Sequence, residues 1–154
     1  MAKGLSLFGL GLVCTALLLA AMPARATLGE SVSTVTTDAQ HLRASTRVTQ
    51  ASNYEVHEMQ SGAATVREYV SDGKVFAVSW QGQARPDLKQ LLGSYYPQLQ
   101  QAVQAEKVQR AGRHPISIQQ GGVVLQMSGH QRAFTGRAYV PNMMPATVRA
   151  QDLR

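Results

Sequence analysis

The chain has 154 residues and one cysteine, and its 15 Lys and Arg against 9 Asp and Glu give a formal net charge of +6. This length is enough for one domain with a real hydrophobic core, and a single cysteine cannot form a disulfide within the chain. The positive residues are scattered, whereas a nucleic-acid-binding surface needs them on one stripe. The composition therefore argues against a nucleic-acid partner.

Residues 1–26 have the three parts of a secretory signal peptide: a positive end with Lys3, an apolar run and the small-residue ending ARA. We expect cleavage after Ala26, and an uncleaved membrane anchor is the alternative. Cys14 lies inside the apolar run rather than at its end, so we expect no lipid on it and no cysteine in the mature chain. Without another long apolar run, no membrane span is expected after cleavage. The predicted location is periplasmic or secreted.

Residues 27–53 are rich in Ser and Thr and poor in large apolar side chains. We expect them to be a lead-in segment, with a short strand around Val32 and Val35. A turn or two of helix follows in DAQHLR, with Thr37 or Asp38 as its N-cap.

Residues 54–80 give the clearest structural signal in the chain. Three runs rich in β-branched and aromatic residues are separated by Gly62-Ala63 and by Asp72-Gly73, and both dipeptides suit two-residue hairpin turns. In this register Glu58 faces Arg67, and His57 faces Glu68. One face is then expected to carry Val56, Tyr69, Phe76, Val78 and Trp80, and the other Met59, Val66, Val70, Val75 and Ala77.

A helix that covers the sheet is predicted after Pro86-Asp87, because apolar residues follow at helical spacing. Pro97 predicts a kink or break at residues 93–96. The side chains of Lys89, Tyr95 and Tyr96 near this break are weak candidates for a binding surface. The alternative for the two tyrosines is packing at the edge of the core with exposed hydroxyl groups.

The last third again predicts strands: ISIQQ and VVLQMS around a Gly121-Gly122 turn, then RAFTGRAYV after a turn at Gly129-His130. Gly136 inside the last run indicates a bulge or a close backbone approach. We expect residues 54–140 to form a single α+β domain, an antiparallel meander of five or six strands with one kinked or broken helix. Residues 141–154 are expected to be a C-terminal tail.

Three blocks, VREYVSDGKVFAVSWQG, PDLKQLLGSYY and SGHQRAFTGRAYVP, together with VHE near Tyr54, carry a family resemblance. With these blocks the sequence resembles a family of small exported bacterial proteins catalogued only as a domain of unknown function. The likeness covers most of the mature chain. It implies export and a single domain, and it carries no catalytic residue or cofactor over to this sequence.

The residues themselves offer little chemistry. The four histidines, His41, His57, His114 and His130, do not have the spacing of a metal site, so no metal or cofactor is expected. An acid beside a histidine can orient it as a general base, which makes His57 and Glu68 weak catalytic candidates. Ordinary cross-strand pairing explains the same two residues.

Two functions follow as hypotheses. The first is an exported, non-catalytic accessory or binding protein of the bacterial cell envelope, which binds an envelope component or a partner protein. For a mildly basic exported protein, an envelope polymer is the most plausible anionic partner, and a solvated basic surface with no such partner is the favoured alternative. The second is a small exported hydrolase that uses His57 and Glu68.

Overall fold

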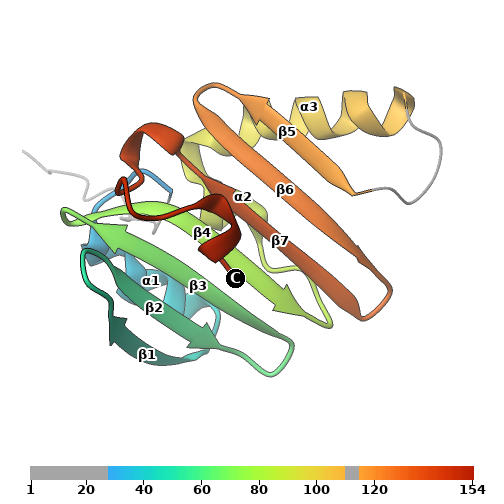
Figure 1. Ribbon diagram of the computed structural model, residues 1–154. Coiled ribbons are helices and arrows are strands. Elements are labelled where there is room, and N and C mark those ends of the chain that lie inside the picture. The colour runs from blue at the N-terminus through green and yellow to red at the C-terminus, as the bar shows by residue number, and fades with distance from the viewer. Residues whose placement is uncertain (1–27, 110–114) are drawn as a thin grey trace, which may run out of the picture.

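The computed structural model describes residues 28–109 and 115–154. Within them, seven strands form one antiparallel sheet in the order β1-β2-β3-β4-β7-β6-β5. Helices cover one face of this sheet, called here the helix face, and residues 141–154 lie on the other, called the tail face (Figure 1). The α+β class is confirmed, whereas the predicted count of five or six strands is wrong because the sheet has seven. The sheet is also not a single meander, because β4 lies beside β7 rather than β5.

The strands are β1 Ser45–Gln50, β2 Glu55–Gln60, β3 Ala64–Ser71, β4 Lys74–Gly82, β5 Ile116–Gln120, β6 Val123–His130 and β7 Ala133–Tyr139. The helices are α1 Val35–His41, α2 Leu88–Leu92 and α3 Tyr96–Gln109. Short 3-10 turns are η1 Val32–Thr34, η2 Gly93–Tyr95, η3 Pro141–Met143 and η4 Ala150–Asp152.

The segment expected to be a lead-in contributes a helix and a strand. Val32 and Val35 lie in η1 and at the start of α1, so the strand predicted there is wrong. Asp38, a predicted N-cap, lies inside α1 and is fully buried. The edge strand β1 was missed because all six of its residues are exposed, which leaves it no alternation of apolar and polar side chains.

Three of the four predicted hairpin turns are confirmed, and one is displaced. At Gly62-Ala63 the flanking Ser61 N–H donates to Ala64 O at 2.9 Å, and β2 and β3 pair in the predicted register. Asp72 and Gly73 have φ angles of 51° and 71°, as a two-residue turn with positive φ at both positions requires. At the turn of Gly121-Gly122 both φ angles are also positive. The predicted turn at Gly129-His130 is wrong, because both residues are paired within the β6–β7 ladder. The chain reverses two residues later, where Arg132 has a φ of 64°.

A β-bulge in β4 changes the predicted pairing of β3 with β4. Val70 pairs with Val75, but Tyr69 pairs with Ala77, which leaves Phe76 as an extra residue. Phe76 and Ala77 therefore both lie on the tail face, in one cluster with Tyr69.

This bulge overturns part of the predicted division into faces. Val78 and Trp80 were expected on the face of Tyr69 and Phe76, but they lie on the helix face. Ala77 lies on the tail face instead of the opposite one. Side chains along a strand alternate between the two faces of the sheet, so one extra residue moves every later side chain to the opposite face. One bulge is therefore enough to cause these errors.

The predicted break in the covering helix is confirmed. The side chain of Asp87 caps α2 by accepting hydrogen bonds from the main-chain N–H groups of Lys89 (2.9 Å) and Gln90 (3.3 Å). Gly93 has a φ of 46°, which ends α2, and the chain resumes as α3 with Pro97 in its first turn.

Two apolar clusters hold the layers together. On the helix face, Trp80 and other strand residues pack against Val35 of α1, Leu91 of α2 and Leu99 of α3. On the tail face, Tyr69, Phe76 and Ala77 pack against Val148 and Leu153, with Met143 and Met144 at the edge of the cluster.

Candidate functional site

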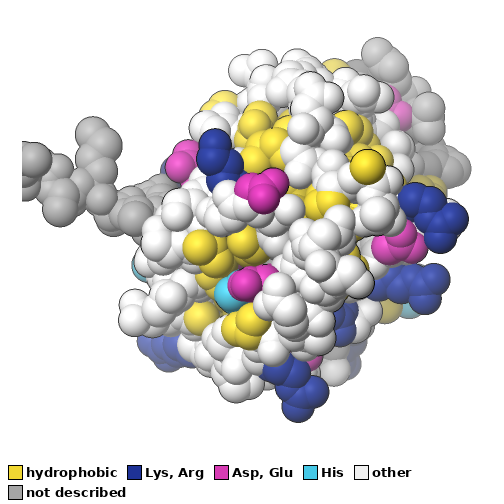
Figure 2. All heavy atoms as spheres, turned by 60° about the vertical axis from the view of Figure 1, so that its left-hand side comes forward, with side chains coloured by type: hydrophobic (Ala, Val, Ile, Leu, Met, Phe, Trp, Pro, Cys, Tyr) yellow, Lys and Arg dark blue, Asp and Glu magenta, His cyan; other side chains and the backbone are white. Residues whose placement is uncertain are grey.

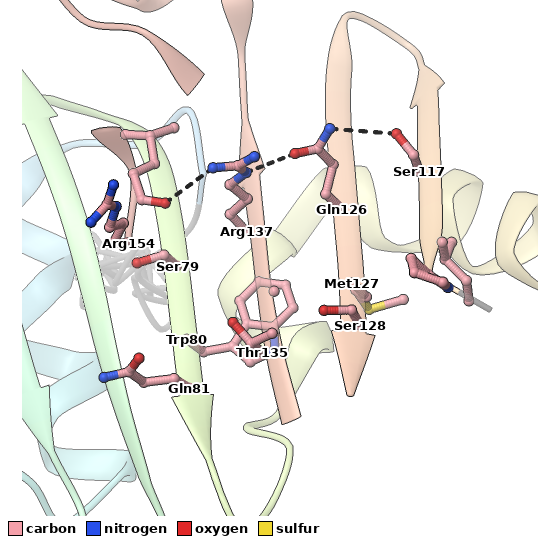
Figure 3. A pocket seen from close by; sticks show the side chains of 14 residues that line it. Ser79, Trp80, Gln81, Ser117, Gln126, Met127, Ser128, Thr135, Arg137 and Arg154 are labelled. Carbon is pink, nitrogen blue, oxygen red and sulfur yellow. Dashed lines mark hydrogen bonds between the residues drawn. The ribbon is translucent and has the colours of Figure 1, made fainter. Parts of the chain in front are cut away.

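A groove lies on the tail face, beside the segment that covers the rest of that face. It has a volume of about 500 Å³ and crosses β4, β7, β6 and β5 (Figure 3). Its polar side chains come from these four strands, and Leu153 and Arg154 of the C-terminal segment complete its lining. The polar lining residues of the strands are Ser79, Gln81, Ser117, Gln126, Ser128, Thr135 and Arg137.

Strand pairing places these side chains in two rows. In the first row Ser79 pairs with Arg137, Arg137 with Gln126 and Gln126 with Ser117, so one polar residue comes from each strand. In the second row Thr135 of β7 is flanked by polar residues of β4 and β6. Directly paired residues of an antiparallel sheet point to the same face, so both rows line the groove.

Arg137 is the best-fixed side chain of the groove. Its Nε donates to Gln126 Oε1 at 2.7 Å, and its Nη1 donates to the main-chain oxygens of Ala150 (2.5 Å) and Leu153 (3.4 Å). Gln126 in turn donates to Ser117 Oγ at 3.5 Å (Figure 3). Arg137 therefore joins the first polar row to the C-terminal segment, and its guanidinium group is held in place before any ligand arrives.

The C-terminal end of the described chain is fastened to the sheet by three more contacts. Arg67 Nη1 donates to the main-chain oxygen of Arg154 at 2.9 Å, and the Tyr69 hydroxyl donates to the same oxygen at 2.8 Å. The main-chain N–H of Arg154 donates to the Tyr69 oxygen at 2.9 Å. Leu153, between these contacts, is 2% exposed. The C-terminal segment therefore forms a fixed wall of the groove.

Gly136 and Trp80 form the support behind the groove. The two residues pair across β4 and β7, and the Trp80 ring lies over Gly136 on the helix face. A Cβ atom on Gly136 would stand 2.3 Å from the Trp80 ring, closer than carbon atoms can approach. The expected close approach at Gly136 is confirmed, and the pairing there has no bulge. The Trp80 ring can lie behind the groove only because Gly136 has no side chain.

His57 and Glu68 face each other on β2 and β3, as the sequence predicts, and both point to the helix face. Glu58 and Arg67, the other predicted pair, are joined by a hydrogen bond of 2.6 Å. The His57 side chain, 12% exposed, has its Nε2 3.1 Å from Glu55 Oε2 rather than bonded to Glu68. The strand pairing brings the two candidates together, but their hydrogen bonds go to other residues.

Glu68 is 1% exposed, so it is not part of the partly exposed pair that the sequence suggested. Its carboxyl group lies beside that of Asp38 in α1, and one oxygen of each is buried without a donor among the described residues, whereas Gln90 of α2 donates to Asp38. Burial, together with the nearby Asp38 carboxyl, raises the pKa of Glu68 to about 9. Burial also raises the pKa of Asp38. Because two carboxylates cannot bond to each other, we infer that they share a proton.

Lys89, Tyr95 and Tyr96, the weak binding candidates, lie on the helix side and away from the groove. Tyr95 and Tyr96 pack against the helix-face core and are partly buried. Lys89 is exposed and lines a separate hollow of about 250 Å³ with His41, Asp87 and Gln90. The structure therefore does not bring these three residues together with the polar rows.

Other site types have little support in the described residues. No group of three or more metal-ligating side chains is found among residues 28–109 and 115–154. Within the same ranges, no helix is both long and apolar enough to cross a membrane. On the side shown in Figure 2, Lys and Arg side chains are spread out rather than gathered in one stripe. The predicted leader, Cys14 and His114 lie outside the described residues.

Sequence reasoning missed the groove because its lining residues carry no motif. Ser, Thr and Gln at alternate positions of a strand are typical of any exposed sheet face. The signal that was present is the recurrence of polar residues at alternate positions in three late strands, with Arg137 among them. Only the strand order, in which β4 lies beside β7, brings Ser79 to the same row.

Comparisons with known proteins give a family, and a distant structural likeness is found among solved structures. A family model described as "Protein of unknown function (DUF2844)" matches residues 24–153. No match is found among curated proteins. A cysteine-rich secretory protein from Staphylococcus aureus is similar with a TM-score of 0.43 and 12% identity, over 78% of this chain. The chain spans half the length of that protein.

Proposed function

This chain belongs to the DUF2844 family, and on that premise we propose that it is an exported, non-catalytic accessory protein that binds a component of the bacterial cell envelope. We propose further that the groove on the tail face is its binding site. The family resemblance seen in the sequence is thereby confirmed, and export, bacterial origin and binding are the parts that we propose.

The observation that carries this proposal is the fixed double row of polar side chains in the groove. Its volume of about 500 Å³ is within the usual range of ligand sites, about 300–1,000 Å³. Side chains that stand on neighbouring strands are held at set spacings by the sheet, so they lose little freedom when a ligand binds. A groove built in this way suits recognition of a polar ligand.

The chemistry of the lining supports binding rather than catalysis. Its described polar residues are Ser, Thr, Gln and Arg, which offer hydrogen bonds and positive charge. A general acid or base needs a pKa near the working pH, and none of these side chain types has one. The acid and histidine that the hydrolase hypothesis requires, Glu68 and His57, lie on the opposite face of the sheet.

Export is proposed from the leader sequence, because residues 1–26 have the three parts of a signal peptide. The expected product is periplasmic or secreted, begins at Thr27 and has no lipid. N-terminal sequencing and intact mass of protein recovered from the envelope or the medium test this. A product that keeps residues 1–26, or that carries an acyl group on Cys14, contradicts it.

Co-sedimentation with isolated cell envelopes tests the binding site. Thr135 is exposed and points into the groove, so Thr135→Trp should fill it and reduce binding at least about tenfold. Thr49→Trp is the matched control, because Thr49 is an exposed threonine on the edge strand β1. Lys89→Ala tests the helix side and should leave binding unchanged. Equal binding by wild type and Thr135→Trp, or loss with Lys89→Ala alone, contradicts the assignment of the groove.

A further inference from the structure

The charged side chains that line the groove are all positive. Arg137 and Arg154 line it, and none of its described lining residues is Asp or Glu. The nearest ion pairs of the same face, Arg67 with Glu58 and Arg149 with Asp152, are each already complete. Arg137 has no acidic partner among the described residues. The groove therefore presents positive charge that an anionic ligand can neutralise.

The hydrogen bonds of Arg137 leave one part of its guanidinium group unused. An arginine side chain has five N–H donors. The Nε donor is taken by Gln126, and Nη1 is directed to the main-chain oxygens of Ala150 and Leu153. The Nη2 group donates no hydrogen bond within the described part of the chain. A positioned guanidinium nitrogen with unused donors is well suited to a carboxylate.

The rest of the lining indicates what carries the carboxylate. Ser and Thr hydroxyls and Gln amides can each both donate and accept hydrogen bonds, which is what the hydroxyl groups of a sugar require. Six such side chains stand in the two rows with Arg137, and all of them except Ser79, which is 2% exposed, are open to a ligand. The ligand meets side chains on the face of the sheet and not the main chain at its edge, so peptide binding by strand addition does not apply.

We propose that the groove binds an acidic glycan, with Arg137 bonded to a carboxylate of the sugar chain and the polar rows bonded to its hydroxyl groups. This inference rests on the proposed function, because it assigns a ligand class to the same groove. It also gives Arg137 two roles, since the residue that fastens the C-terminal segment is the one that meets the ligand.

Titration calorimetry with defined polymers tests this inference. Polygalacturonate carries carboxylates and hydroxyls, its methyl ester keeps the hydroxyls without the charge, and polyglutamate keeps the charge without the hydroxyls. Polygalacturonate should bind at least about tenfold more tightly than either of the others, which is the scale of one charged hydrogen bond. Its binding should weaken as salt rises.

Two variants separate ligand contact from loosening of the C-terminal segment. Arg137→Gln removes the charge and also the bonds to that segment, so it should lose at least tenfold in affinity for polygalacturonate. Thr135→Glu places a like charge in the groove without touching the segment, and it should lose as much. Thr49→Glu on β1 is the matched control and should bind as wild type does.

Several results overturn the inference while leaving the proposed function intact. Equal affinity for the methyl ester excludes the carboxylate contact, and equal or tighter binding of polyglutamate excludes the glycan. Absence of polygalacturonate binding in protein that still sediments with envelopes excludes an acidic glycan as ligand. If envelope binding itself is absent in wild type, the proposed function fails instead.

Discussion

The two faces of the sheet are closed in different ways. On the helix face, three helices cover a continuous apolar cluster that includes Trp80 and the buried carboxyl pair of Asp38 and Glu68. On the tail face, a short segment without an α-helix covers only the smaller cluster around Tyr69 and Phe76. Across β4, β7, β6 and β5, the tail face carries the polar groove instead.

The difference shows how one sheet can serve both stability and recognition. Burial of apolar area supplies most of the free energy of folding, and the helix face supplies the larger share of it. The tail face can therefore leave polar rows exposed without loss of the fold. The bulge at Phe76 divides that face, because it directs two consecutive residues toward the tail segment just before the polar row that starts at the buried Ser79.

Truncation of Trp80 should have the largest effect, because it removes the largest side chain of the helix-face core. Trp80 is 3% exposed, so Trp80→Ala should lower the free energy of unfolding by about 3–5 kcal/mol. Val48→Ala on the edge strand is the control, since Val48 is 54% exposed and should change stability by less than about 0.5 kcal/mol. Urea unfolding followed by circular dichroism measures both, because Trp80 is the only tryptophan and its removal takes away the tryptophan fluorescence signal. Equal stability of the two variants would contradict the assignment of Trp80 to the core.

Truncation of Leu153 should have the next largest effect and tests the tail-face cluster. Leu153 is 2% exposed, but it belongs to the smaller cluster near the end of the described chain. We expect Leu153→Ala to cost about 2–3 kcal/mol, the lower part of the range for buried leucines. Gln151→Ala, two residues earlier and exposed, is the control. A loss with Leu153→Ala as large as that with Trp80→Ala would show that the faces contribute equally.

The carboxyl pair should make stability depend on pH. The pKa of Glu68 is about 9 in the folded protein, whereas its ordinary value is 4.5. Between these values the unfolded chain has lost a proton that the folded protein keeps, so stability falls as pH rises. The slope for this group is at most about 1.4 kcal/mol per pH unit, and it ends above pH 9.

Thermal melts between pH 5 and pH 9 measure this slope. Glu68→Gln keeps the shape of the side chain but cannot ionise, so most of the fall in stability should disappear. Glu30→Gln, at an exposed residue, should keep the wild-type slope. If Glu68→Gln also keeps that slope, the buried pair is not its origin.

Much of the fold follows from local sequence signals. The turns at Asp72-Gly73 and Gly121-Gly122 and the helix break before Pro97 each rest on the backbone preferences of one or two residues. The bulge at Phe76 has no such signal, because an extra apolar residue in an apolar strand leaves the pattern unchanged. The start of α1 was predicted too late in the chain, because Asp38 is a residue type typical of an N-cap. Only tertiary contacts explain a buried aspartate inside a helix.

The candidate site was less predictable than the fold. His57 and Glu68 attracted attention because they are titratable and adjacent, which the hairpin register does establish. Glu68 instead lies beside Asp38, and this contact depends on where α1 packs against the sheet. No spacing of residues in the sequence specifies that position. The groove depends on β4 lying beside β7, a contact between residues more than fifty positions apart. Long-range pairing of this kind leaves no local trace.

Substitution of His57 should have the smallest effect, and it separates binding from hydrolysis. His57 lies on the helix face, away from the groove, and its contact with Glu55 is a partly exposed pair. His57→Ala should therefore lower stability by less than about 1 kcal/mol and change envelope binding by less than about twofold. The matched measurement is release of soluble fragments from isolated envelopes, with wild type and His57→Ala compared at equal folded concentration. If wild type releases fragments and folded His57→Ala does so about a hundredfold more slowly, the loss has the size expected of a general base, and the hydrolase hypothesis replaces the binding one.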